Sequence, residues 1–237
     1  MLAANHIDQG ACYTNISTRK WIVMNVLGTC YRVFSETSLI KRLDEISSTF
    51  KSSDPDRIVK FSQLIWSLDP AILDAVRICI CFENFFKAEL LLKGYVIHRI
   101  DKGSLPAIYR YLAKDQSMRP IKISEIKLAE GLRWKRKNNY SFQSLSNFTI
   151  ELSVFLRQQN YKSRLRMPTQ LITSLERINR RRNTLHYLTN DISFYNQQII
   201  DEVSCIKRCF NDFLVTRRNQ LVRELNYPDI HLKQPLS

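Results

Sequence analysis

Glycine is scarce in this sequence, with 5 residues among 237. Tight turns between strands and glycine-rich phosphate loops both depend on glycine. Neither a GxGxxG nor a GxxxxGK[ST] pattern occurs. The scarcity therefore argues against a β-rich fold and against a nucleotide-binding loop of either type.

Long apolar runs are missing as well. No stretch of roughly eighteen residues is apolar and free of charge, so we expect no segment that spans a membrane and no membrane partner. The N-terminal sequence MLAANHIDQG lacks the basic region followed by an apolar region that a signal peptide has. Both observations predict a protein that stays in the cytoplasm.

The cysteines form neither a CxxC motif nor a Cys/His cluster with zinc spacing. There are six of them: Cys12, Cys30, Cys79, Cys81, Cys205 and Cys209. Cys79 and Cys81 lie in the apolar run RICICFENFF, where a free cysteine behaves as a small hydrophobic residue. We therefore expect a reducing compartment, no disulfide framework, no metal site and no cofactor.

Positive charge is abundant. Lys and Arg number 36 against 22 Asp and Glu, which gives a net charge of +14 and a pI near 9.7. Such a field attracts polyanions and speeds their encounter. Nucleic acid is the commonest target of such a field and an anionic membrane surface the second, and we expect nucleic acid here. The plainer interpretation is a basic protein that docks on an acidic partner.

Apolar residues recur with helical spacing along most of the chain. The clearest predicted helices cover 20–43 (one helix or two), 56–68, 70 to about 94–99, 104–114, 168–188 and 192–225. Asp69-Pro70 and Pro168 are start signals for two of them. The stretch 118–128 predicts a short strand or an extended loop, 141–160 a helix with a slight β tendency, and 161–167 a basic connector. The sequence thus predicts an all-α helical bundle.

No composition break marks a domain boundary. We expect a core bundle over 69–226, with 1–68 packing on it as an N-terminal helical extension. Residues 227–237, which include two prolines, form a predicted C-terminal tail.

Two helices carry a charge where their apolar stripe should continue. In the helix from Pro168 the stripe is Leu171, Leu175, Ile178 and Leu185, and Arg182 takes the position between the last two. In the helix from Pro70 the stripe is Ile72, Val76, Cys79, Phe86 and Leu90, and Glu83 interrupts it. A charge in a core position is costly unless it is paired. We therefore expect Glu83 and Arg182 to pair.

His186 shares a helical face with the polar residues before it. At about 100° per residue, Arg182 lies about 40° from His186, Asn183 about 60° and Asn179 about 20°. The plain interpretation is a core or interface histidine beside a solvated basic face. The chemical interpretation is RNA cleavage, because a histidine can move protons near neutral pH and arginine clamps phosphate. One histidine cannot easily be acid and base at once, so a second copy in a homodimer is expected.

Two segments resemble the HEPN superfamily, helical-bundle proteins of toxin–antitoxin systems, phage defence and RNA processing. Arg181, four residues and then His186 fit the family's Arg-x4-6-His motif. FENFFKAELLLKGYVIHRI (82–100) is similar to the first core helix of many members. The resemblance implies a metal-independent endoribonuclease with a composite dimer site, Arg181 and His186 as its catalytic pair and Glu83 in support. In the family, an asparagine usually follows the arginine that begins the Arg-x4-6-His motif. Here Asn183 follows Arg182, so either Arg181 or Arg182 can be the catalytic arginine.

Basic residues elsewhere are candidates for RNA binding. They are Arg133, Trp134, Lys135, Arg136 and Lys137 in one stretch, and Arg164, Arg166 and Arg180 in two others. Phosphate contacts with aromatic stacking are typical of single-stranded RNA sites, whereas a solvated loop with Trp134 in the core is equally compatible. Two other functions stay open: a non-catalytic HEPN-like subunit that binds RNA or a partner such as an antitoxin or defence protein, and an unrelated basic interaction or DNA-binding subunit.

Overall fold

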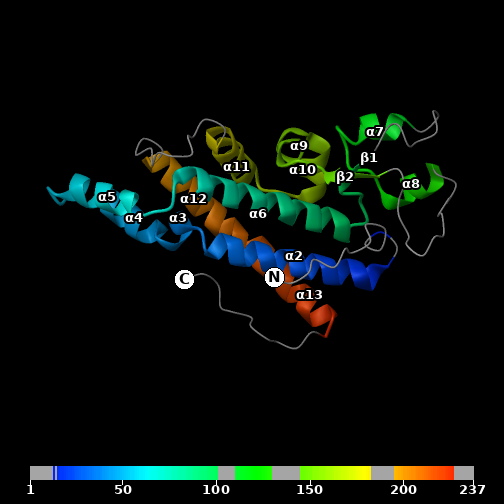
Figure 1. The fold of residues 1–237 in the computed structure, drawn as a ribbon, viewed down its shortest axis with the longest axis horizontal. Helices are drawn as coiled ribbons and strands as arrows, with labels where there is room; N and C mark the ends of the chain where they lie inside the picture. Colours follow the sequence, from blue (N-terminus) through cyan, green and yellow to red (C-terminus); the bar gives the residue numbers. More distant parts are fainter. Residues whose placement is uncertain (1–12, 14, 101–109, 130–144, 183–194, 227–237) are drawn as a thin grey trace. The chain divides into compact units, whose positions relative to one another are not determined.

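The chain is mostly helical, which confirms the predicted all-α class. The structure is a computed structural model that describes residues 13, 15–100, 110–129, 145–182 and 195–226 (Figure 1). Its helices are α2 (Ile16–Ser35), α3 (Ser38–Lys41), α4 (Leu43–Lys51), α5 (Arg57–Trp66), α6 (Ala71–Leu92), α7 (Tyr111–Asp115), α8 (Ile123–Ala129), α9 (Leu152–Arg157), α10 (Gln159–Leu165), α11 (Thr169–Arg182), α12 (Gln197–Cys209), the π-helix η3 (Phe210–Val215) and α13 (Thr216–Glu224). In the described part of the chain, no helix has both the length and the apolar character to cross a membrane.

The chain divides into two compact units. Unit 1 comprises Met1–Val26, Phe85–Arg166 and Leu221–Tyr227, and unit 2 comprises Leu27–Asn84, Met167–Gln220 and Pro228–Ser237. Each unit combines segments from before and after residue 68. A separate extension over 1–68 therefore stays a prediction.

An aromatic cluster forms the core of unit 2. The ring of Phe210 on η3 stacks on that of Phe34 on α2, with centroids 3.9 Å apart, and meets the edge of Phe82 on α6 at 6.3 Å. Tyr31 lies beside Phe210 at 6.2 Å. Offset and edge contacts of this kind stabilise a core beyond the area they bury.

Two cysteines join α2 and α6 within unit 2. The Cys30 thiol donates to the Cys81 carbonyl at 3.5 Å, and the Cys81 thiol donates to the Cys30 carbonyl at 3.4 Å. Both residues are buried and form no disulfide. The predicted role of Cys81 as a small core residue is confirmed.

Asp74 on α6 closes the N-terminus of α3. Its side chain is fully buried and accepts hydrogen bonds from Ser38 N–H at 3.2 Å, from the Ser38 hydroxyl at 2.8 Å and from Leu39 N–H at 2.8 Å. The first amide groups of a helix have no partner within the helix. Asp74 supplies that partner from another element and so fixes α3 against α6.

Unit 1 contains a two-stranded antiparallel sheet of β1 (His98–Ile100) and β2 (Leu145–Thr149). The Tyr13 hydroxyl accepts the N–H groups of Ile97 and His98, and it lies 2.6 Å from His98 Nδ1. Burial, and then the nearby charge of Lys87, lowers the pKa of His98. The neutral ring can therefore accept a hydrogen bond from the Tyr13 hydroxyl at Nδ1.

A second aromatic cluster lies in unit 1. Phe155 on α9 meets Phe86 on α6 and Tyr161 on α10, with centroids 5.8 and 5.6 Å apart. The Tyr161 hydroxyl donates to the Gln116 carbonyl at 2.7 Å, and the Gln116 side chain bonds the backbone of β1 at His98 and Ile100. These contacts tie α10 to the strand.

Several predicted elements differ from the structure in their bounds. The segment 20–43 is interrupted at Thr37, where the backbone is extended and α3 begins. The predicted strand or loop over 118–128 is limited to a single bridge between Tyr95 and Lys122, after which α8 begins at Ile123. The Glu125 carboxylate accepts Lys122 N–H at 2.9 Å and so favours a helix start there.

The predictions for the next two stretches are partly wrong. A helix over 141–160 gives way to β2, because pairing with the distant strand β1 satisfies that backbone. The predicted connector over 161–167 is helical as far as Leu165, where α10 ends in a left-handed turn at Arg166. In the final predicted helix, the π segment η3 separates α12 from α13.

Candidate functional site

Helix α11 carries the arginines of the motif on its last turn. Its buried stripe is Leu171, Leu175 and Ile178, as the sequence predicts, and this stripe packs against α12 in unit 2 (Figure 1). Arg180 is exposed, whereas Arg181 and Arg182 are half-buried. The end of α11 therefore holds two guanidinium groups at the edge of a packed core.

Polar side chains fix α11 to α12 at two levels. Arg177 Nη1 donates to Glu202 Oε1 at 3.0 Å, and the Glu202 side chain is 5% exposed. One turn further along, Arg181 Nη2 donates to Gln198 Oε1 at 3.2 Å. Because 177 pairs with 202 and 181 with 198, the two helices run antiparallel, and Arg181 lies on the side that faces α12.

The charge of Arg182 acts on α6. Burial raises the pKa of the Cys79 thiol on α6 to about 12, the positive charge of Arg182 opposes this shift, and the negative charge of Glu83 adds to it. Coulomb interactions fall with distance, so Arg182 and Glu83 both lie within electrostatic range of Cys79. A direct ion pair between Glu83 and Arg182 stays a prediction.

Part of the predicted site lies outside the described residues. Nothing in the structure tests His186 and Asn183, nor the predicted RNA-binding stretch Arg133, Trp134, Lys135, Arg136 and Lys137. Of the remaining candidates, Arg180, Arg181, Arg182 and Glu83 belong to unit 2, and Arg164 and Arg166 belong to unit 1. Glu83 and Arg182 both lie within electrostatic range of Cys79 in unit 2, and Arg164 lines a surface of unit 1.

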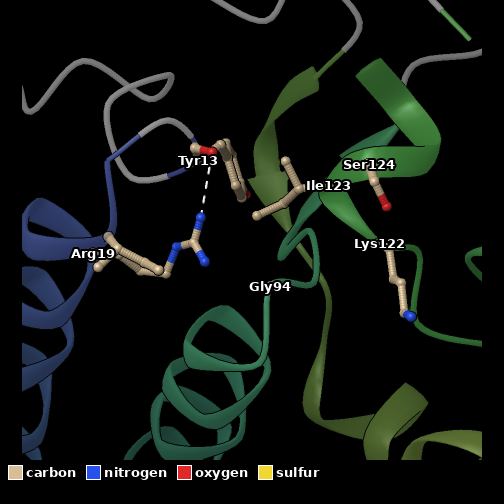
Figure 2. Close-up of a pocket in the computed structure, with 7 residues that line it drawn as sticks. Tyr13, Arg19, Gly94, Lys122, Ile123 and Ser124 are labelled. Carbon is tan, nitrogen blue, oxygen red and sulfur yellow. Dashed lines mark hydrogen bonds between the residues drawn. The ribbon is translucent and has the colours of Figure 1, made fainter. Parts of the chain in front are cut away.

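That surface contains two neighbouring hollows in unit 1. The first, called here the Arg19 hollow, has a volume of about 330 Å³ and is lined by Tyr13, Ile16, Arg19, Gly94, Lys122, Ile123 and Ser124. Figure 2 shows Arg19 reaching from α2 to the backbone oxygen of Tyr13, with Lys122 and Ser124 at the start of α8. Arg19 Nη2 donates to that oxygen at 3.3 Å. Among the residues that the structure describes, two cations and no acid line this hollow.

Gly94 allows the chain to turn at the wall of the Arg19 hollow. Its φ is +78°, in the left-handed region that residues with a side chain rarely adopt. A Cβ at this position would lie 3.9 Å from Arg19 Nη1. That distance is an ordinary contact, so the left-handed backbone and not the space beside Arg19 favours glycine at the end of α6.

The second hollow, called here the Arg164 hollow, has a volume of about 360 Å³. Its lining is Tyr95, Arg119, Pro120, Lys122, Glu125, Asn160, Ser163 and Arg164. The guanidinium of Arg164 lies over the Tyr95 ring, 5.9 Å from its centroid. Arg119 binds both Asp115 and Glu125 at 2.9 Å. Of the cations here, sequence reasoning had identified Arg164 alone.

Glu125 is charged in this setting. Burial alone would raise its pKa, but hydrogen bonds from Arg119 and from Lys122 N–H, together with the two positive charges, lower it. The carboxylate therefore neutralises part of the Arg119 charge. Among the residues that the structure describes, no group of three or more His, Cys, Asp and Glu side chains could hold a metal ion.

Comparisons with protein-family models, with curated proteins and with solved structures give no match for this chain.

Proposed function

We propose that the protein is a metal-independent endoribonuclease of HEPN type, with His186 and an arginine at the end of α11 as its catalytic residues. What supports the proposal is that Arg182, at the end of α11, and Glu83, on α6, both lie close enough to Cys79 for their charges to act on the pKa of its thiol. The resemblance implies that the acidic residue of α6 supports the arginine-rich end of α11. Two charges that act on the same thiol are compatible with that arrangement.

The chemistry needs three contributions from the protein. A base takes the proton from the ribose 2′-hydroxyl, whose oxygen attacks the phosphorus. An acid gives a proton to the leaving 5′-oxygen, and a cation stabilises the charge that develops on the phosphate. Cleavage yields a 2′,3′-cyclic phosphate and a free 5′-hydroxyl. His186 performs a proton transfer, and Arg181 or Arg182 stabilises the phosphate.

Arg181 is the better placed of the two arginines for the phosphate. Arg181 donates a hydrogen bond to the amide oxygen of Gln198, which orients its guanidinium beside α12. Arg182 acts electrostatically on Cys79 of α6. The proposal includes a second copy of the chain, whose His186 supplies the other proton transfer, and a role as a toxin or defence effector.

The test is the cleavage of a 5′-labelled RNA by the purified protein in excess EDTA. We expect cyclic-phosphate products from the unchanged protein, and a loss of about 100-fold or more in rate for His186→Ala, since general acid–base groups contribute at least that much. Arg181→Ala should lose more activity than Arg182→Ala. Light scattering of the same sample should give the mass of a dimer.

The chain offers a matched control. Arg217-Arg218-Asn219 repeats the basic triplet without a following histidine, and Arg217 bonds Gln220 on its own helix. Arg217→Ala should cleave at the normal rate. The proposal fails if folded, unchanged protein cleaves no RNA, if EDTA abolishes cleavage, or if His186→Ala cleaves as fast as the unchanged protein. Binding without cleavage would point to the non-catalytic RNA-binding alternative.

A further inference from the structure

The two hollows of unit 1 form one basic surface, because Lys122 lines both. Together their walls carry four cations and one carboxylate: Arg19, Arg119, Lys122, Arg164 and Glu125. Arg119 is occupied by Glu125 and Asp115. The remaining charge is positive on both sides of Lys122.

Neither Lys122 nor Arg164 forms an ion pair within the described residues, although the charge of Lys122 contributes to the lowered pKa of the nearby Glu125 carboxylate. The structure gives the Lys122 ammonium no ion pair there, although the backbone N–H of the same residue bonds Glu125. Arg164 contacts the Tyr95 ring with its guanidinium, and its carbonyl oxygen accepts Lys93 Nζ at 2.7 Å. Both side chains are exposed. Their charges are therefore available to an anionic ligand.

We propose that the Arg19 and Arg164 hollows bind neighbouring phosphates of one RNA strand, with Lys122 between them. This inference rests on the proposed function for the identity of the ligand. Each hollow, at about 330 and 360 Å³, has the volume of a small-molecule site and can take a phosphate with its sugar. The hydroxyls of Ser124 and Ser163 add polar groups at the two walls.

The lining predicts contact with the backbone of the strand and little reading of its bases. Base stacking needs an open aromatic face, and Arg164 covers that of Tyr95. Tyr13 is engaged through its hydroxyl with β1. Phosphate contacts position a nucleic acid without selecting its sequence. This surface is therefore expected to bind the strand without selecting its sequence.

The experiment measures binding of a fluorescent 2′-O-methyl RNA by anisotropy at several salt concentrations. This RNA has no free 2′-hydroxyl and cannot be cleaved by the proposed chemistry, so the measurement does not depend on catalysis. Lys122→Ala and Arg164→Ala should each weaken binding about fivefold. Each should also lower the slope of log affinity against log salt by roughly 0.7, the value for one lost phosphate contact on a single strand.

Lys114→Ala is the matched control. Lys114 is an exposed lysine of unit 1 on α7 and lines neither hollow. It should bind the RNA as the unchanged protein does. Equal weakening by Lys114→Ala would mean that only the general positive field matters, and would overturn the inference. Unchanged binding by folded Lys122→Ala and Arg164→Ala proteins would overturn it too.

Failure of this inference and failure of the nuclease proposal give different results. If the unchanged protein cleaves RNA and Lys122→Ala neither weakens binding nor changes the salt slope, the nuclease stands and the second surface falls. If the protein never cleaves RNA, but Lys122→Ala and Arg164→Ala weaken binding and Lys114→Ala does not, the surface stands alone. Thermal unfolding of each variant verifies that it is folded.

Discussion

Two arginines on α11 and α6 in unit 2 form ion pairs with acids, whereas Lys122 and Arg164 at the hollows of unit 1 form none within the described part of the chain. Around α11 in unit 2, Arg177 meets the buried carboxylate of Glu202, and nearby on α6 Arg77 bonds Asp69 and Asp74. Around the hollows of unit 1, Lys122 and Arg164 have no such partner among the described residues. A cation that is paired with a buried acid stabilises the fold. A cation that lines a hollow and forms no ion pair can bind a ligand.

This difference indicates which positive charges of a strongly basic chain can bind a ligand. A net charge of +14 belongs to the whole sequence, but the structure commits part of it to internal pairs. Removing one partner of a buried pair is costly because it leaves a desolvated charge. Removing an exposed, unpaired lysine changes stability little. Unit 2 should therefore respond to substitution in its stability, and the hollows of unit 1 in their binding.

The largest effect is expected at the aromatic cluster of unit 2. Phe210 is fully buried and stacked on Phe34, so Phe210→Ala should lower the free energy of unfolding by about 4 kcal/mol. Phe213 lies on the same π-helix but is 39% exposed. Phe213→Ala should cost less than about 1 kcal/mol. Urea denaturation measures both, and equal costs would refute the role given to the Phe210 cluster.

An intermediate loss of stability is expected when Asp74 is substituted. Asp74→Ala leaves Ser38 N–H and Leu39 N–H without their acceptor and should destabilise the protein by about 2 kcal/mol. Asp69 also bonds Arg77, but it is 44% exposed, so Asp69→Ala should cost about 0.5 kcal/mol or less. If the two variants unfold at the same urea concentration, the buried carboxylate of Asp74 stabilises unit 2 no more than the exposed one of Asp69. That result would contradict the contrast drawn between the two units.

The smallest effect is a pH dependence in unit 1. Burial and the Lys87 charge lower the pKa of His98 below its usual 6.5, so below pH 6.5 the unfolded chain binds more protons at this residue than the folded one. Stability from His98 is then complete above pH 6.5 and falls as the pH drops. His98→Gln should lose less free energy of unfolding between pH 7 and 5.5 than the unchanged protein. An identical loss in both would show that His98 takes up its proton equally in the two states.

Helix positions were predictable where a start signal and a periodic stripe coincide. Pro70 precedes α6 and Pro168 precedes α11, and most residues of the predicted stripes are buried, whereas Val76 of α6 is half-buried. The strand β2 was not predictable, because its partner β1 is distant in the sequence and a local pattern cannot report such pairing. The π segment at Phe210 also has no periodic signal, since apolar spacing indicates only that the backbone is helical.

In the candidate sites too, some residues could be identified from the sequence and others could not. Glu83 and Arg182 were singled out because each interrupts an apolar stripe, and a charge in a core position needs a partner. Both are half-buried, and their pairing stays a prediction. The Arg19 hollow was not predictable, because only the tertiary structure brings Arg19 of α2 to Lys122 before α8. Local sequence around either residue looks like an ordinary solvated helix or loop. Arg164 was identified as a basic residue near the motif helix, without its neighbours in the hollow.

The paired thiols of α2 and α6 have a practical consequence for labelling. The hydrogen bond from Cys30 and then burial raise the pKa of Cys81, and burial raises the pKa of Cys79 to about 12. Thiolate is the form that alkylating reagents attack, so these sulfurs stay inert at neutral pH. A cysteine engineered at an exposed position such as Lys122 would react ahead of them and could carry a fluorophore or crosslinker.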